Sequence, residues 1–77
     1  MITITQTLEY ILKSIISTPD EISITTSEDN GLMMIEIHAP AEVTGQIIGK
    51  QGKTIKAIRT ILNLSFPSVK YLLEIRN

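Results

Sequence analysis

Two glycines and two lysines stand close together in the segment from Gln46 to Ile55. Gly49 and Gly52 are separated by two residues, and a lysine directly follows each of them. Because glycine lacks a Cβ atom, another backbone can approach it closely, and unusual φ angles cost it little. Free backbone N–H groups and ammonium groups both attract phosphate. The spacing therefore predicts a turn that binds a phosphate-bearing ligand.

The charge distribution supports an anionic ligand on the C-terminal part of the chain. The net charge is −1, but residues 1–48 carry one cation and seven acids, whereas residues 49–77 carry six cations and one acid. Such asymmetry points weakly to an anionic partner. The alternative is a mixed surface on which charges of opposite sign meet.

Two helices are predicted on either side of the glycine turn. Residues 41–48 form a short helix with apolar Val43, and residues 53–63 form a second helix after Gly52. The first turn of a helix has unpaired N–H groups and a partial positive charge, both of which suit phosphate. Ile47, Ile48 and Ile55 are expected to anchor the turn to the core.

The remaining elements follow from periodicity and turn residues. A helix is predicted at about 7–17, and strands at 21–25, 32–39 and 69–76. Residues 28–31 end in Asn-Gly, which favours a tight hairpin turn. The order is αββααβ. The apolar residues that share a face of these elements are Leu8, Ile11, Leu12, Ile15, Ile22, Ile24, Met33, Ile35, Ile37, Ile55, Ile58, Ile61 and Leu62.

Length and composition limit the class of protein. Seventy-seven residues and 8.6 kDa indicate one small domain, residues 1–77, with a core built mainly from Ile and Leu. The absence of cysteine excludes disulfides and thiolate chemistry. No apolar run is long enough for a membrane span, and no signal peptide is expected. A soluble intracellular domain is the default expectation.

The residues from Ile48 to Ile55, Ile-Gly-Lys-Gln-Gly-Lys-Thr-Ile, resemble the I-G-x-x-G-x-x-I signature of the KH domain. The αββααβ order is that of the type II KH fold. Over nearly its whole length, the chain is similar to the small bacterial KH proteins of the KhpA (YlqC) type. The resemblance implies an α+β fold in which a three-stranded mixed sheet packs on three helices.

The resemblance also implies a function. KH domains clamp single-stranded RNA with their GXXG loop, here Gly49–Gly52, and lysines supply salt-dependent attraction. Base edges would be read near residues 36–38. The expected RNA-binding residues are Ile47, Ile48, Gly49, Lys50, Gln51, Gly52, Lys53, Ile55 and Lys56. The implied role is that of a cytoplasmic RNA chaperone or post-transcriptional regulator, linked to cell elongation and division.

Partners follow from the same resemblance. Proteins of this type dimerise with themselves or with a larger KH protein of the Jag (KhpB) type, and Ile61, Leu64 and Phe66 are the expected interface. Two features depart from the family. Val43 stands where an acidic residue is frequent, and the connection 63–68 is short and apolar where the family has a longer Lys- and Gly-rich loop.

Other functions find less support in the residues. A P-loop ending at Gly52-Lys53-Thr54 needs glycine at position 47, which is Ile. One histidine without cysteine gives no metal site, and the serines have no His/Asp partners, so neither an enzyme nor a cofactor is expected. The lysines after Gly52 would also suit a plain solvated face. The alternative function is a protein-interaction module whose RNA binding is weak or vestigial.

Overall fold

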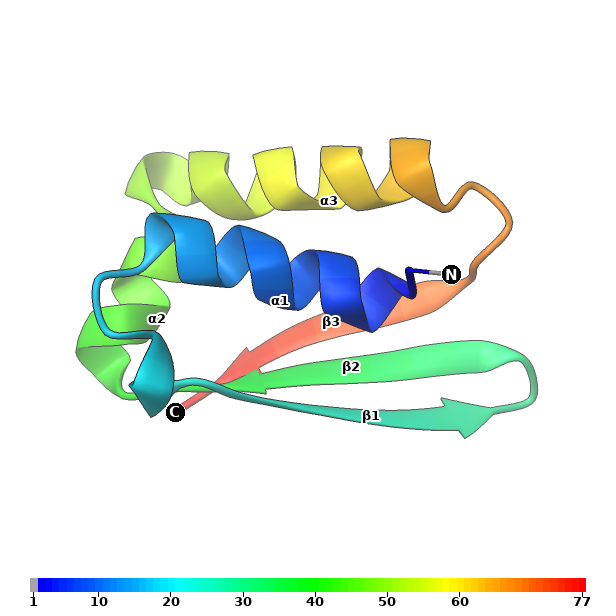
Figure 1. Cartoon of the computed structure of the whole chain (residues 1–77), viewed down its shortest axis with the longest axis horizontal. Coiled ribbons are helices and arrows are strands. Elements are labelled where there is room, and N and C mark those ends of the chain that lie inside the picture. Colours follow the sequence, from blue (N-terminus) through cyan, green and yellow to red (C-terminus); the bar gives the residue numbers. More distant parts are fainter. Residues whose placement is uncertain (1) are drawn as a thin grey trace.

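Three α-helices lie over one face of a three-stranded sheet in the computed structural model, which describes residues 2–77 (Figure 1). The elements are α1 (Ile4–Ile15), β1 (Ser23–Asp29), β2 (Leu32–His38), α2 (Ala41–Ile48), α3 (Lys53–Ser65) and β3 (Tyr71–Arg76), with 3-10 turns η1 (Pro19–Glu21) and η2 (Lys50–Gly52). The predicted α+β class and the order αββααβ are confirmed. None of the helices in residues 2–77 has the length and hydropathy of a membrane span.

The sheet has the order β1-β2-β3, so β2 is central and β3 is an edge strand. β1 and β2 are antiparallel, and β2 and β3 are parallel. Asn30 and Gly31 join the first pair with φ angles of 53° and 82°, as the predicted Asn-Gly turn requires. β1 runs to Asp29, beyond the predicted end at residue 25, because it pairs with β2 as far as the Asp29–Leu32 pair.

Helix α1 starts three residues before its predicted start. The reason is a capping box: the Gln6 backbone N–H donates to Thr3 Oγ1 over 3.1 Å, and the Thr3 N–H donates to Gln6 Oε1 over 2.9 Å. The prediction that Ile15 faces the core was wrong, since Ile15 is 46% exposed. The chain leaves the helix at Ile16, which is extended and buried in its place.

The core lies between the helices and the inner face of the sheet. Leu8, Leu12, Ile35, Ile37, Ile47 and Leu62 are its largest fully buried side chains. Ile61, on the apolar arc of α3 and an expected interface residue, is 44% exposed. Helix α3 extends two residues past its predicted end, and β3 begins at Tyr71, so the connection before β3 is residues 66–70. The core fixes α2 and α3 relative to β3, and these three elements position the candidate site.

Candidate functional site

The turn between α2 and α3 has an unusual backbone. Gly49 ends α2, where its N–H donates to the Gly45 carbonyl over 2.9 Å, and the Gly52 N–H donates to the Gly49 carbonyl over 3.1 Å. Gly49, Gln51 and Gly52 have φ angles of 76°, 59° and 74°. Three of four consecutive residues thus adopt positive φ, and the chain reverses within one 3-10 turn.

The two glycines are required for different reasons. A Cβ atom on Gly49 would collide with the side chain of Thr54 and lie 2.9 Å from its backbone nitrogen, so this site permits no side chain. A Cβ atom on Gly52 would meet nothing within 4 Å. Gly52 therefore faces open space, and a ligand backbone has room to approach it.

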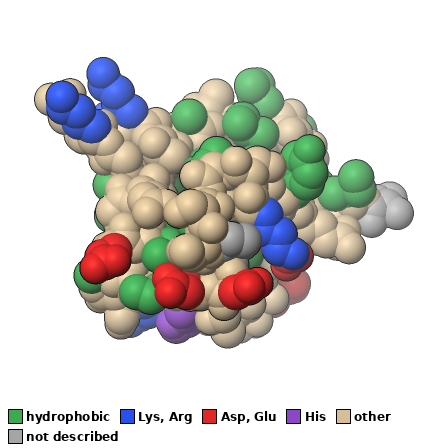
Figure 2. Space-filling view, turned by 60° about the vertical axis from the view of Figure 1, so that its left-hand side comes forward, with side chains coloured by type: hydrophobic (Ala, Val, Ile, Leu, Met, Phe, Trp, Pro, Cys, Tyr) green, Lys and Arg blue, Asp and Glu red, His purple; other side chains and the backbone are tan. Residues whose placement is uncertain are grey.

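Cations surround this open side. Lys50, Lys53 and Lys56 are exposed, and no ion pair within residues 2–77 occupies them. In the same described part of the chain, no side chain caps the N-terminus of α3 at Gly52. Figure 2 shows Lys and Arg side chains on a projection at the upper left, away from the acidic side chains along the lower part of that view. The arrangement provides a positive potential for an anion.

The three isoleucines next to the turn take two different positions. Ile47 and Ile55 are 0% and 8% exposed, so they anchor the turn as predicted, and little of either side chain is left for a ligand to reach. Ile48 was expected to anchor the turn as well; it is instead 40% exposed, because it lies at the end of α2 on the side away from Val43 and Ile47. Ile48 is the apolar side chain next to the turn that a ligand can reach.

A groove lies between α3 and the edge strand β3. It has a volume of about 580 Å³, and its lining residues are Leu32, Arg59, Asn63, Val69, Lys70, Tyr71, Leu72 and Leu73. Lys56, Arg59 and Asn63 follow one another at helical spacings of three and four, so the cationic face of α3 leads from the turn into this groove.

Tyr71 connects the two sides of this groove. Its hydroxyl donates to Asn63 Oδ1 over 2.8 Å and lies 3.4 Å from the Arg59 carbonyl oxygen. Partial burial raises the pKa of Tyr71 above its usual 10.0, and the nearby Arg59 charge opposes that shift. Sequence reasoning missed Asn63 and Tyr71 as site residues. No local signal in the sequence brings these two side chains together, because their contact depends on the parallel pairing of β2 with β3.

Residues 36–38, which were expected to lie near the base edges, do not line this groove. They lie on the central strand β2, whose two edges pair with β1 and β3. The Glu36 carboxylate accepts from Arg76 Nε over 2.8 Å, and His38 Nε2 lies 3.5 Å from it. These side chains form a polar cluster between neighbouring strands instead.

The three residues expected to form a dimer interface are not equally available. Ile61 and Leu64 are 44% and 78% exposed. Phe66 is half-buried and packs against the core, so its side chain is partly used within the monomer. The exposed apolar surface at the C-terminal half of α3 therefore consists of Ile61 and Leu64.

Metal-ligand clusters and buried polar side chains are both absent from the described part of the chain. Among the described residues 2–77, no three His, Asp or Glu side chains lie close enough together to hold a metal ion. The same residues contain no buried polar or charged side chain.

Comparison with known proteins identifies relatives along most of the chain. The family model described as KhpA/KhpB, KH domain, matches residues 5–71. A protein of Chlamydia caviae named RNA-binding protein KhpA is 40% identical over 70 residues, covering 88% of this chain and 90% of its own. Proteins of the same name from Treponema pallidum and Thermotoga maritima are 33% and 38% identical, over 88% and 73% of this chain and 88% and 75% of their own.

Proposed function

The chain belongs to the KhpA/KhpB family of KH domains, and from this we propose that it binds single-stranded RNA at the Gly49–Gly52 turn. The observation that carries the proposal is the turn itself. Its open side at Gly52 is bordered by Lys50 and Lys53, and neither lysine is held in an ion pair of the described residues.

The contacts proposed for the RNA follow the geometry. The sugar–phosphate backbone lies against Gly52, where no Cβ atom intrudes, and Lys50 and Lys53 contact phosphates. Ile48 supplies apolar contact beside the turn. The strand then continues along Lys56 and Arg59 of α3. Ile47 and Ile55 act from below by fixing the turn.

In this proposal the protein acts in the cytoplasm, without catalysis and without a cofactor. The proposal extends to an RNA chaperone or post-transcriptional regulator, with a link to cell elongation and division, on the basis of the family resemblance. Because few phosphate contacts give weak binding, we also propose that a second KH domain adds avidity. The partner is a second copy or a larger KH protein of the KhpB type. Exposed Ile61 and Leu64 on α3 support such a contact.

Fluorescence anisotropy with a labelled twelve-residue uridine oligomer tests the RNA proposal. The double variant Lys50→Asp/Gly52→Asp should weaken binding at low salt by at least about tenfold, because two phosphate contacts become repulsive. The matched control is Lys13→Asp/Gly31→Asp. Gly31 also has positive φ, and a Cβ atom there would likewise meet nothing within 4 Å, so the two double variants match in charge change and in the kind of backbone strain.

Three outcomes separate the candidates. A loss confined to the first variant supports the turn as the site. An equal loss in both variants contradicts it. Wild-type protein that binds no oligomer at low salt would favour the alternative of a protein-interaction module.

A further inference from the structure

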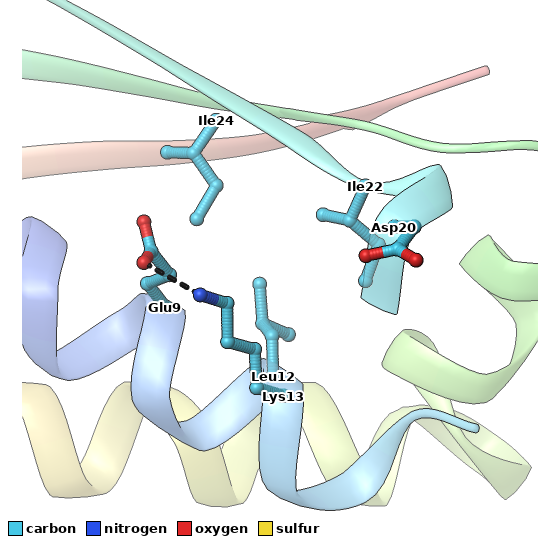
Figure 3. Close-up of a pocket in the computed structure, with 6 residues that line it drawn as sticks. All are labelled: Glu9, Leu12, Lys13, Asp20, Ile22 and Ile24. Atoms are coloured by element: carbon cyan, nitrogen blue, oxygen red, sulfur yellow. Dashed lines mark hydrogen bonds and ion pairs between the residues drawn. The ribbon is translucent and has the colours of Figure 1, made fainter. Parts of the chain in front are cut away.

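A small cavity of about 310 Å³ lies between α1 and β1, on the acidic N-terminal part of the chain (Figure 3). Leu12, Ile22 and Ile24 give it an apolar lining, and Glu9, Lys13 and Asp20 form its polar rim. Pockets for whole small molecules span roughly 300–1,000 Å³. The cavity is therefore at the lower limit of that range, and it is large enough to admit an aliphatic side chain.

The strand above this cavity has a free edge. β1 is a terminal strand of the sheet, and apart from its ladder with β2, its backbone makes no hydrogen bond to another described residue. Nearly all its residues are exposed. An open edge presents N–H and C=O groups to which an extended peptide adds as a further strand. Alternate side chains of that strand point towards α1, where the cavity lies.

The charges around this edge favour a partner of positive charge. Acidic residues lie at both ends of the strand and at the rim of the cavity: Glu9, Asp20, Glu21, Glu28 and Asp29. The nearby cation Lys13 is already paired with Glu9 over 3.0 Å. The surface therefore repels RNA and attracts a cationic peptide.

A second copy of the chain is a poor occupant of this edge. Antiparallel pairing of two β1 strands about Thr26 would place Asp29 of one copy opposite Ser23 of the other, next to Asp20 and Glu21. Bringing these like charges together at both ends of the strand pair is unfavourable. The acidic ends thus disfavour self-pairing and leave the edge available to a segment of opposite charge.

We propose that the β1 edge docks an extended cationic segment of another protein as an added strand, with one aliphatic side chain in the α1–β1 cavity. The basis is the combination of a free edge, a cavity beneath it and complementary charge. This site lies on different residues from the proposed RNA site, so either proposal can fail without the other.

NMR titration with three capped ten-residue peptides tests the docking site. The peptides alternate Lys-Val, Lys-Gly or Glu-Val. The Lys-Val peptide should shift the backbone amides of residues 23–29 and the methyl signals of Leu12, Ile22 and Ile24. The Glu-Val peptide should not bind, and the Lys-Gly peptide should bind at least about threefold more weakly, because it has no side chain for the cavity.

Charge variants provide a second arm of the experiment. Glu28→Lys should weaken the Lys-Val peptide about threefold to tenfold, and Glu42→Lys, an equal charge change on exposed α2, should leave its affinity unchanged. Equal binding of the Lys-Gly or Glu-Val peptide would overturn the proposal. So would largest shifts away from α1 and residues 20–29, or no shifts at millimolar Lys-Val peptide in low salt.

Discussion

Gly49 lies so close to Thr54 that a Cβ atom at position 49 would be 2.7 Å from the Thr54 Cβ atom and 2.9 Å from its backbone nitrogen. The end of α2 and the first turn of α3 are therefore in direct contact across the glycine. This contact holds the turn in one shape, and Gly52 at its far end remains open. The first glycine thus serves the fold, and the second leaves room for a ligand.

Alanine at the two glycine positions should have unequal costs. Gly49 has φ 76° and ψ 174°, a region open almost only to glycine, and Gly49→Ala adds the collision with Thr54. We expect a loss of about 2–5 kcal/mol in the free energy of unfolding. Gly52→Ala, in a left-handed conformation without a collision, should lose about 1–2 kcal/mol. Urea denaturation measures both, and equal losses would contradict the assignment.

RNA affinity should fall with salt in proportion to the lysines that contact phosphates. With Lys50, Lys53, Lys56 and Arg59 in contact, the logarithm of the binding constant should fall with the logarithm of salt concentration with a slope of about −3. Lys53→Gln should reduce the slope by about 0.7, and Lys13→Gln should leave it unchanged. A slope near zero, or the same change in both variants, would show that these lysines do not bind phosphate.

Tyr71 should stabilise the α3–β3 groove in a pH-dependent way. Loss of its hydrogen bond to Asn63 in Tyr71→Phe should cost about 0.5–1.5 kcal/mol at pH 7. Because the pKa of Tyr71 is raised, the native state favours the neutral phenol. The stabilisation that comes from this preference is fully present below pH 10.0, the ordinary pKa of tyrosine. It is lost as the pH rises through the higher pKa of Tyr71 in the folded protein.

The difference in stability between wild type and Tyr71→Phe should therefore shrink above pH 10, as measured by urea denaturation across pH. Tyr10→Phe is the control, since Tyr10 is 75% exposed and its replacement should change stability by less than about 0.5 kcal/mol. A constant difference up to pH 12 would argue against a preference for the neutral phenol.

Self-association, if it uses α3, should be sensitive to a charge at Ile61. Ile61→Asp should convert dimers to monomers in sedimentation velocity, because an unpaired carboxylate would be buried in the interface. Leu72→Asp is a matched control, since Leu72 on β3 is 45% exposed and Ile61 is 44% exposed. Unchanged sedimentation of Ile61→Asp, or equal dissociation of both variants, would place the dimer interface elsewhere.

Local sequence patterns predicted those parts of the fold whose cause is local. Helix α2 begins and ends at the predicted residues, and the Asn30–Gly31 turn follows from backbone preferences of two residues. The start of α1 was missed because helical periodicity does not mark a first residue. The Thr3–Gln6 capping box marks it. Periodicity also failed for Ile15, because Ile16 leaves the helix and turns inward.

The candidate site was predictable only in part. The glycine turn follows from two residues and their spacing, whereas the groove beside it depends on the parallel pairing of β2 with β3, a long-range contact. Local alternation does not show which strand forms the edge, so the side chains that line the groove, Tyr71 among them, were not predicted. The exposure of Ile48 likewise depends on where neighbouring elements end.

The most direct test of the proposed RNA site is an amide-resolved NMR titration of the wild-type protein with an unlabelled uridine octamer at low salt. The account predicts that the largest shifts occur in residues 49–53, with smaller shifts along α3 as far as Arg59. Largest shifts on the acidic β1 edge, or no shifts in the turn at saturating oligomer, would contradict it.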